Sequence, residues 1–376
     1  MSQSKGKVLV AMSGGLDSSV TAALLCEKGY ECIGVYMNFW SDPTVFEQDE
    51  QDNFPQNKCC SIESLNTARR IASKLNMPFY VLNVKDRFKK EIVDYFIDTY
   101  KICHTPNPCV ECNRSIKFGF LLERMKQLGA DYVATGHFVR VKKKKKKGNT
   151  VYELWMGKDK VKDQSYFLYT LGQDKLKHVM FPVGGMTKDK VRKEAKKRGL
   201  LEPLEKKESQ GICFFPDKQH TDFLKRYFPK SVLKEGPIVT TKGENIGTHK
   251  GLQCFTVGQR KGIDIGGEKD PWYVARLDYE KNTLVVGKDD EVFQNDFKIH
   301  KMTFTEEEME DGEHEVRARI RYRFPPQKAV LTKNGDNARI RFLKPQRAIT
   351  PGQSVVFYDK ERVLGGGIIK SITYSK

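Results

Sequence analysis

A six-residue loop with two adjacent glycines, Ser-Gly-Gly-Leu-Asp-Ser at residues 13–18, lies between the apolar run Val8–Met12 and a helical pattern over Ser18–Lys28. A short apolar run before a helical pattern predicts a buried strand that leads through a tight loop into a helix. The glycines let the backbone approach a polyphosphate closely, Ser13 and Ser18 offer hydroxyl donors, and the helix start favours an anion. The loop lacks both the Walker A ending and the dinucleotide spacing. We predict a pyrophosphate-binding loop, with an ordinary glycine turn as the alternative.

The alternation of strands and helices continues through the first half of the chain. The expected strands are Lys7–Met12, Cys32–Met37, Phe79–Val84 and Tyr132–Thr135, and the expected helices are Ser18–Lys28, Ser61–Leu75, Arg87–Tyr100 and Ser115–Leu128. This rhythm predicts an α/β fold, a doubly wound parallel sheet with helices on both faces. Ligands bind such sheets at the carboxyl ends of the strands. We therefore expect the glycine loop, residues 37–40 and residues 135–137 to share one edge.

The pattern changes after about Tyr227, and a chain of 376 residues is long enough for two or three domains. From Gly236 onward, short β-type runs separated by Gly, Asp, Asn and Pro replace the strand–helix alternation. This spacing predicts a small β-rich domain followed by a β-barrel. We expect domain boundaries that give residues 1–222, 223–289 and 290–376.

The net charge of +18 favours a polyanionic partner, and nucleic acid is the leading candidate. A basic surface that only aids solubility is the alternative. The run Lys142–Lys147 predicts a solvated, self-repelling loop tip, after which Tyr152–Trp155 could return as the second strand of a hairpin. Direct contact of this run with nucleic acid is the less favoured interpretation. No apolar run approaches the length of a membrane span, and no signal-type segment precedes Val8, so we expect a cytoplasmic protein without membrane contact.

Nine cysteines, an odd number, argue against a disulfide framework. Cys109 and Cys112 form a Cys-x-x-Cys in a proline-stiffened turn that we expect just ahead of a helix starting near Ser115, where a thiolate is favoured. Cys213 lies in a second glycine-containing loop. A half zinc site at Cys109 and Cys112 is an alternative, although no second pair completes it locally. We expect Cys26 and Cys32 to fill the core and assign the remaining cysteines structural roles: Cys59, Cys60, Cys103 and Cys254.

Eight motifs occur in one order along the chain. They are Ala11–Ser18, Thr105-Pro-Asn-Pro-Cys-Val-Glu-Cys-Asn113, Thr135-Gly-His-Phe138, Lys162-Asp-Gln-Ser-Tyr-Phe-Leu168, Ser209-Gln-Gly-Ile-Cys-Phe214, Val257-Gly-Gln-Arg-Lys-Gly262, Arg321-Tyr-Arg323 and Pro351-Gly-Gln353. In these motifs the chain resembles the tRNA-specific 2-thiouridylases, of the ATP pyrophosphatase type, over nearly its whole length. The resemblance implies that ATP adenylates the C2 oxygen of the wobble uridine and that sulfur replaces this oxygen, in tRNAs for lysine, glutamate and glutamine.

The resemblance also assigns roles to individual residues. It implies that ATP is bound by Ala11, Met12, Ser13, Gly14, Gly15, Leu16, Asp17, Ser18, Met37 and Gly136. It implies that Asn107, Pro108 and Cys109 approach the target base and that the tRNA is contacted by His137, Lys162, Asp163, Gln164, Arg321, Tyr322 and Gln353. Cys112 matches the nucleophile and Cys213 the persulfide carrier. Asp17 is expected to act with Mg²⁺ on the departing pyrophosphate.

Two departures from the family pattern bear on the mechanism. Many members have aspartate where this chain has Cys109, so Cys109, Cys112 and Cys213 could together hold a four-iron four-sulfur cluster. In the other version Cys213 carries a persulfide that Cys112 resolves. We favour the cluster because of the third cysteine. The second departure, residues 61–64, replaces an expected acidic pair and leaves the role of that helix start open.

The partners follow from the same resemblance. We expect a tRNA anticodon stem-loop and a sulfur-donor protein such as a cysteine desulfurase or a sulfur relay. Arg317, Arg319, Arg321 and Arg323 alternate, which predicts four guanidinium groups on one strand face that grips the anticodon stem, or else an ordinary solvent face. The rival functions are an amidating synthetase of the ATP pyrophosphatase group and a basic RNA-binding module with structural zinc.

Overall fold

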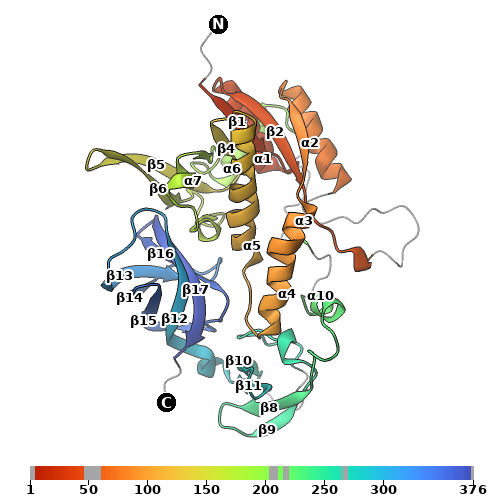
Figure 1. Ribbon diagram of the computed structural model, residues 1–376, viewed down its shortest axis with the longest axis vertical. Helices are drawn as coiled ribbons and strands as arrows, with labels where there is room; N and C mark the ends of the chain where they lie inside the picture. Colours follow the sequence, from red (N-terminus) through yellow and green to blue (C-terminus); the bar gives the residue numbers. More distant parts are fainter. Residues whose placement is uncertain are drawn as a thin grey trace.

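The computed structural model describes residues 5–45, 61–202, 211–214, 220–263, 265 and 270–373. Figure 1 shows three parts arranged along the long axis: a parallel sheet with its helices, a barrel in blue, and a small sheet in teal beside it. This arrangement confirms the predicted α/β domain, small β-rich part and C-terminal barrel. Within the described residues, no helix combines the length and the apolar character that crossing a bilayer requires.

The first sheet has the strand order β3-β2-β1-β4-β7, and all its pairings are parallel. Its strands are β1 (Lys7–Ala11), β2 (Glu31–Asn38), β3 (Phe79–Asn83), β4 (Tyr132–Ala134) and β7 (Val179–Met180). Val8 and Val10 pack into one hydrophobic core with two helices that follow β1 and β2, and Leu9 packs into another on the opposite face. Because successive strand residues point to opposite faces, this alternation buries both sides of the sheet. The sheet is therefore doubly wound, as predicted.

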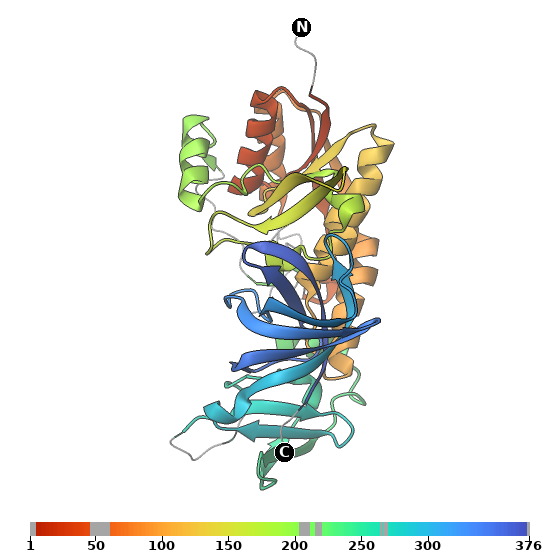
Figure 2. The same cartoon turned by 90° about the vertical axis from the view of Figure 1, so that its left-hand side faces the viewer.

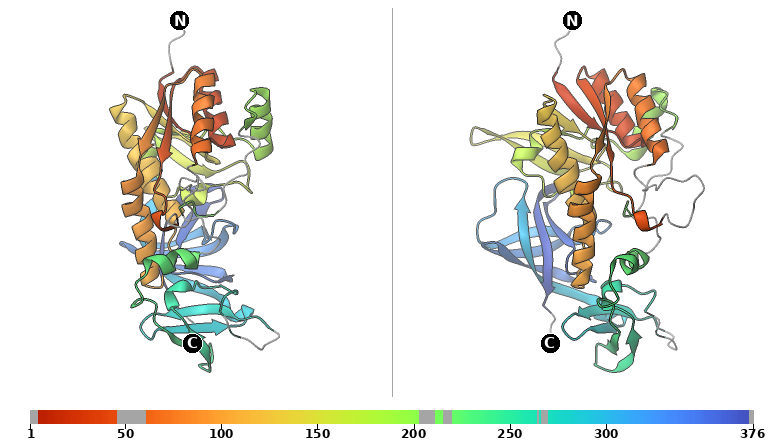
Figure 3. Two further views of the ribbon diagram at one scale, coloured as in Figure 1. Left: turned by 90° about the vertical axis from the view of Figure 1, so that its right-hand side faces the viewer. Right: turned by 45° about the vertical axis from the view of Figure 1, so that its right-hand side comes forward.

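Helices cover both faces of this sheet. On one face lie α1 (Leu16–Glu27), α2 (Ile62–Lys74) and α8 (Lys188–Lys197), and on the other lie α3 (Lys85–Phe88), η2 (Lys89–Val93), α4 (Asp94–Lys101), α5 (Pro108–Glu111), η3 (Cys112–Phe120) and α6 (Leu121–Gln127). Shorter helical segments are η1 (Pro43–Val45), η4 (Ser165–Phe167), α7 (Gln173–Leu176), α10 (His220–Tyr227), η5 (Leu252–Cys254) and η6 (Asp289–Val292). Figure 3 shows the helices from α3 to α6 running alongside the barrel.

The helix that carries the Cys-x-x-Cys begins earlier than the sequence predicted. It starts at Pro108 rather than near Ser115, and it continues as α5, η3 and α6 to Gln127. Asn107 caps the helix and Pro108 occupies its first position, where the missing N–H of proline costs nothing. The turns of η3 are of the wider π type. The two cysteines therefore lie inside the first helical turns, and the expected turn ahead of the helix is wrong.

The second half of the chain forms the small sheet and the barrel. The small sheet has the order β10-β11-β8-β9, from β8 (Gly236–Thr240), β9 (Asn245–His249), β10 (Tyr273–Asp278) and β11 (Thr283–Gly287). The barrel contains β12 (Phe293–Phe304), β13 (Gly312–Arg319), β14 (Gln327–Asn334), β15 (Asn337–Arg347), β16 (Ser354–Asp359) and β17 (Arg362–Ile372). It closes because β12 pairs with both β15 and β17. A domain boundary between residues 222 and 223 falls inside α10.

A hairpin from the first half of the chain joins the barrel sheet. Its strands, β5 (Val139–Lys146) and β6 (Asn149–Met156), pair residue by residue, and β6 meets β17 where Trp155 lies opposite Arg362. Figure 2 shows this hairpin between the first sheet and the barrel. The lysines up to Lys146 therefore belong to a strand, and only Lys147 and Gly148 form the turn, with positive φ. The predicted loop tip is wrong, and the hairpin is confirmed.

Candidate active site

One cavity of about 780 Å³ lies at the carboxyl ends of the first sheet's strands. Its lining brings together the glycine loop, the start of α2, the start of α5 and the segment 211–214. The lining residues include Ala11, Met12, Ser13, Gly14, Gly15, Leu16, Asp17, Ser18, Met37, Glu63, Pro108, Cys109, Cys112, Lys117, Gly136, His137, Gln164, Lys188, Arg192 and Cys213. The structure thus places the whole predicted ATP-binding set and all three candidate cysteines around one space.

Internal hydrogen bonds hold the glycine loop in shape. The Ser13 N–H donates to Ser18 Oγ (3.2 Å), and the Ser18 hydroxyl donates to the Gly15 carbonyl (2.9 Å). Gly14 has φ +71°, and a Cβ there would lie 2.1 Å from the Ser64 carbonyl oxygen. Only glycine fits this close approach to α2. The loop is therefore preorganised, with the N-terminus of the twelve-residue α1 beside the cavity.

Asp17, in the first turn of α1, is held by a lysine that the sequence did not single out. Lys188 Nζ lies 2.8 Å from both carboxylate oxygens of Asp17, and its side chain is only 7% exposed. Gly136 packs against the same turn, because a Cβ there would lie 2.9 Å from Ser18 N. The lysine comes from α8, 171 residues away in sequence, so no local pattern links it to the loop. The cavity thus places a cation beside the predicted phosphate site.

The cysteines of the Cys-x-x-Cys lie one helical turn apart. Asn107 Oδ1 accepts from the Val110 N–H (3.3 Å) and fixes the start of α5. Cys112 is buried, Cys109 is half-buried, and Cys213 is half-buried in the segment 211–214. All three line the cavity. Among the residues that the structure describes, however, no three His, Cys, Asp or Glu side chains are grouped closely enough to hold a metal ion.

His137 forms a buried polar contact in the cavity wall. Its Nδ1 lies 2.7 Å from Thr135 Oγ1, and its ring packs against Phe118 and Phe181. Burial, with a smaller contribution from the charge of Lys117, holds the pKa of His137 well below its usual value. The imidazole is therefore neutral near pH 7. A neutral ring can donate or accept a hydrogen bond to a base without adding charge to the site.

Several residues to which the resemblance assigns tRNA contact join parts of the protein. Asp163 is buried and lies 2.9 Å from Arg319 Nη1 in the barrel. Gln353 Nε2 donates to the carbonyl of Pro106 (2.8 Å), just before the cysteine helix. Arg321 Nη2 donates to the Ala348 carbonyl (2.6 Å). Asp163 is only 2% exposed. It links the two parts of the protein, and its assignment as a tRNA contact stays a prediction.

The remaining members of this set lie around the same junction. Gln164 Oε1 accepts from the Phe138 N–H (3.0 Å) at the cavity wall. The ring of Tyr322 packs against Phe167, with centroids 4.5 Å apart. Lys162 is half-buried. Gln164 lines the cavity, so it is placed where a nucleotide base could reach it.

The expected face of four arginines is wrong. Strand β13 ends at Arg319, so Arg321 and Arg323 lie beyond it. Within the strand, Arg317 is exposed, whereas Arg319 is buried against Asp163. Alternation along the sequence could not reveal this difference, because the strand end and the buried carboxylate both depend on distant segments.

The other cysteines have the expected structural positions where they are described. Cys32, Cys103 and Cys254 are buried in hydrophobic cores, and Cys26 packs against one of them. Cys59 and Cys60 lie outside the described residues. The helix start at residues 61–64 is explained by Ser61, whose hydroxyl accepts from the Ser64 N–H (3.0 Å) and caps α2.

Three family models match successive parts of the chain: a "tRNA methyl transferase HUP domain" at residues 6–217, a "tRNA methyl transferase PRC-barrel domain" at 221–288 and an "aminomethyltransferase beta-barrel domain" at 294–369. The chain is 46% identical over 366 residues to the tRNA-specific 2-thiouridylase MnmA 1 of Caldanaerobacter subterraneus, covering 97% of this chain and 98% of the relative. It is 43% identical over 365 residues to the MnmA of Clostridium acetobutylicum, covering 97% and 99%.

Solved structures are more distant. The U34-tRNA thiolase NcsA from Methanococcus maripaludis, solved with its [4Fe-4S] cluster, is 19% identical, with a TM-score of 0.34 and coverage of 61% of this chain and 70% of that chain. A similarity this low says nothing about the role of the cysteines in this chain. The near full-length relatives decide the family: the chain belongs to the tRNA-specific 2-thiouridylases, which are sulfurtransferases.

Proposed function

We propose that this protein uses ATP to replace the C2 oxygen of the wobble uridine of tRNA with sulfur. The observation that carries the proposal is the single cavity that holds both the glycine loop and three cysteines, Cys109, Cys112 and Cys213. The names of the relatives identify tRNA as their substrate and the 2-position of uridine as the position that receives sulfur. The name of the first family model mentions methyl transfer, but a phosphate loop beside thiols suits activation by ATP and attack by sulfur.

The first step activates the uridine. The loop amides and the N-terminus of α1 would bind the polyphosphate of ATP, and Lys188 would add a positive charge. The C2 oxygen attacks the α-phosphorus, and pyrophosphate leaves. Asp17 and Glu63 are the carboxylates that line this part of the cavity. These two residues would hold Mg²⁺, which would supply positive charge to the pyrophosphate when bound.

The second step transfers sulfur through a persulfide on Cys213. A donor protein, such as a cysteine desulfurase or a sulfur relay, supplies the outer sulfur. This sulfur attacks C2 of the adenylated uridine, and AMP leaves with the oxygen. Cys112 then attacks Cys213 Sγ, which breaks the persulfide bond, releases 2-thiouridine and leaves a Cys112–Cys213 disulfide. A thiol reductant reopens the disulfide with two electrons and two protons.

The persulfide route takes the place of the sequence-based preference for an iron–sulfur cluster. It needs only Cys112 and Cys213, both of which line the cavity, whereas a cluster needs all three thiolates as ligands. Among the described residues, no group of three His, Cys, Asp or Glu side chains is placed to hold a metal ion. We therefore derive no step through a cluster.

The rival functions suit the cavity less well. An amidating synthetase of the same fold needs no thiols beside its phosphate loop, whereas here three thiols line the cavity. A zinc-stabilised RNA-binding module needs a metal site, which the described residues do not form. The preference for lysine, glutamate and glutamine tRNAs rests on the family resemblance.

The direct test is incubation with ATP, unmodified tRNA and a persulfide donor. AMP release that depends on tRNA, together with 2-thiouridine in the digested RNA, is the expected result. AMP release without tRNA, or with ammonia and a small acid as the stimulating substrate, would point to a synthetase and overturn the proposal.

Single cysteine variants test the sulfur route. With oxygen-free protein, Cys112→Ser and Cys213→Ser should abolish thiolation, whereas Cys109→Ser should keep much of it, because Cys109 has no step in the persulfide route. Iron per chain is measured on the same samples. Stoichiometric iron that is lost together with activity in all three variants would establish the cluster instead, since a hydroxyl is a poor ligand for iron.

A further inference from the structure

The hairpin β5–β6 divides its lysines between two faces. On one face, Lys142 Nζ lies 3.4 Å from the ring centroid of Trp155, Lys144 Nζ lies 3.1 Å from Glu153, and Lys146 pairs with Glu306 of the barrel segment. These contacts join the hairpin to its own partner strand and to the barrel. The charges on this face are therefore already matched by protein groups.

The other face presents lysines without such partners. Among the described residues, no ion pair or hydrogen bond is found for the side chains of Lys143 and Lys145, and both are exposed. Lys143 lies opposite Tyr152 and Lys145 opposite Thr150, so all four side chains share one face. Toward the base of the hairpin the same face carries Leu154, which is buried in the main core. This face is therefore apolar and buried near the base of the hairpin, and it is exposed and positively charged toward the turn.

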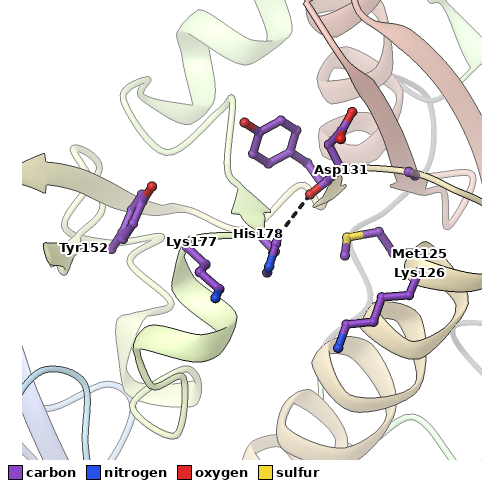
Figure 4. Close-up of a pocket in the computed structure, with 8 residues that line it drawn as sticks. Met125, Lys126, Asp131, Tyr152, Lys177 and His178 are labelled. Atoms are coloured by element: carbon purple, nitrogen blue, oxygen red, sulfur yellow. Dashed lines mark hydrogen bonds between the residues drawn. The ribbon is translucent and has the colours of Figure 1, made fainter. Parts of the chain in front are cut away.

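A surface hollow of about 380 Å³ continues this face. Figure 4 shows Tyr152 on one side, Lys177 and His178 in the middle, and Lys126 on the helix opposite. Lys126 comes from α6, and Lys177 follows directly after α7. The hydrogen bonds between Gln173 and the backbone of Tyr152 (2.9 and 2.7 Å) fix α7 to the hairpin. Lysines from two separate elements, Lys126 of α6 and Lys177 after α7, thus line one hollow, and the hairpin contributes Tyr152.

One carboxylate, that of Asp131, lines the hollow and offsets part of its positive charge. It also accepts a hydrogen bond from the Lys7 N–H (2.8 Å). His178 Nδ1 donates to the Asp131 carbonyl (3.1 Å). Asp174, the acidic residue of α7, is not among the residues that line the hollow. We name Lys126, Lys143, Lys145 and Lys177 the hairpin cationic surface.

We propose that the hairpin cationic surface binds the phosphate backbone of tRNA outside the anticodon stem-loop. This inference rests on the proposed function, which supplies tRNA as the polyanion. Lysine ammonium groups on separate elements suit phosphate contacts, which position an RNA without reading its sequence. The hollow lies at the start of β4 beside Asp131, whereas the active-site cavity contains His137. Six residues span at most about 22 Å, so one folded tRNA can reach both.

A role in protecting the sheet edge is the competing explanation, because β5 is the outermost strand of its sheet and lysines discourage edge-to-edge pairing. That role requires charge but no tRNA contact. It also gives no reason for Lys126 and Lys177, which lie on or beside helices.

The test compares whole tRNA with its isolated anticodon stem-loop. The triple variant Lys143→Gln, Lys145→Gln, Lys177→Gln should bind whole tRNA about tenfold more weakly, with the slope of log affinity against log salt reduced by about two to three. Binding and thiolation of the stem-loop should stay unchanged. A matched control replaces three exposed lysines of α8, Lys193, Lys196 and Lys197, by glutamine. This control removes the same charge and should change whole-tRNA affinity much less.

Three results would overturn the proposal. Unchanged affinity for whole tRNA would leave edge protection as the role of the lysines. If the triple variant and the α8 control lost equal affinity for whole tRNA, the loss would follow from the lower net charge and not from these particular lysines. Loss of binding to an acidic sulfur-donor protein, with tRNA affinity intact, would assign the surface to that protein. If wild-type protein binds tRNA through this surface but never thiolates the stem-loop, the surface stands and the proposed function fails.

Discussion

Asn107 illustrates how one side chain sets the geometry of the thiols. Its Oδ1 caps α5 through the Val110 N–H (3.3 Å), and its own carbonyl begins the helix. The two cysteines follow within the next five residues. The loop glycines and the cysteine pair were predictable, because each motif consists of residues that are close together in the sequence. Lys188 was not predictable, because its partner Asp17 is brought to it only by the folded sheet.

We expect Asn107→Ala to lower the free energy of unfolding by about 1 kcal/mol, the usual cost of losing a cap, and to slow thiolation. Asn107→Asp keeps a capping oxygen and should retain stability. Urea unfolding and single-turnover thiolation measure the two effects. An alanine variant as stable as the wild type would show that the cap does not hold the helix start.

A second prediction concerns His137, whose pKa is held well below its usual value by burial. In the unfolded chain a histidine binds a proton near pH 6.5, so below that pH the unfolded state binds more protons than the folded state. Stability should therefore fall as pH drops below 6.5, by up to about 1.4 kcal/mol per pH unit for this group. His137→Gln should remove that share of the slope. Urea midpoints between pH 5 and pH 7.5 measure it, and an unchanged slope would contradict the assignment.

At the scale of elements, the glycine loop and α2 form one packed unit. The Ser64 carbonyl lies where a side chain on Gly14 would be, whereas a Cβ on Gly15 would meet nothing closer than Ser13 Oγ at 3.4 Å. Gly15 has φ −92°, an ordinary value for any residue. The two neighbouring glycines therefore have different reasons to be glycine.

The difference between Gly14 and Gly15 can be tested with one alanine variant at each position. Gly14→Ala should destabilise the protein and abolish ATP binding, because its Cβ would meet a backbone carbonyl at 2.1 Å and its φ is positive. Gly15→Ala should fold with nearly wild-type stability, and any loss of ATP affinity there would report on the ligand alone. Thermal unfolding and equilibrium ATP binding separate the effects. Equal destabilisation by both variants would count against the packing argument.

The elements that sequence reasoning placed wrongly share a physical cause. The strand β5 contains five lysines, Lys142–Lys146, which in isolation repel one another and favour a loop. On one face of the strand, Glu153 pairs with Lys144, the ring of Trp155 contacts Lys142 and Glu306 pairs with Lys146, which offsets part of this repulsion. The early start of the cysteine helix depends on a local cap, which the proline-rich sequence around Asn107 obscured. The parallel sheet was predictable because its apolar runs are buried on both faces.

On the scale of the whole molecule, the catalytic half and the barrel are joined through buried polar contacts. Asp163 accepts hydrogen bonds from the Gly157 and Ser165 N–H groups and pairs with Arg319 of β13. Gln353 links the barrel to the loop before the cysteine helix. The barrel thus helps to hold the start of the helix that carries Cys109 and Cys112.

Breaking this junction should be costly. Asp163→Ala leaves the buried Arg319 without its carboxylate, and we expect a loss of about 3–5 kcal/mol in the free energy of unfolding. The control is the exposed pair Arg70–Glu202, 2.7 Å apart, where Glu202→Ala should cost about 1 kcal/mol or less. The double variant Asp163→Leu, Arg319→Leu should recover part of the loss. Equal effects of the two single variants in urea unfolding would refute the linking role.

The pairing of β6 with β17 also orders events during synthesis. Trp155 meets Arg362, and the Met156 N–H donates to the Glu361 carbonyl (2.8 Å). About 200 residues separate these partners. At a synthesis rate of roughly 5–20 residues per second, β17 is therefore made on the order of 10–40 s after β6. The parallel sheet can collapse early, but the edge of β6 is paired only once β17 has emerged. A chain that stops short of β17 would leave this edge of β6 without its partner strand, a site for edge-to-edge pairing with other chains.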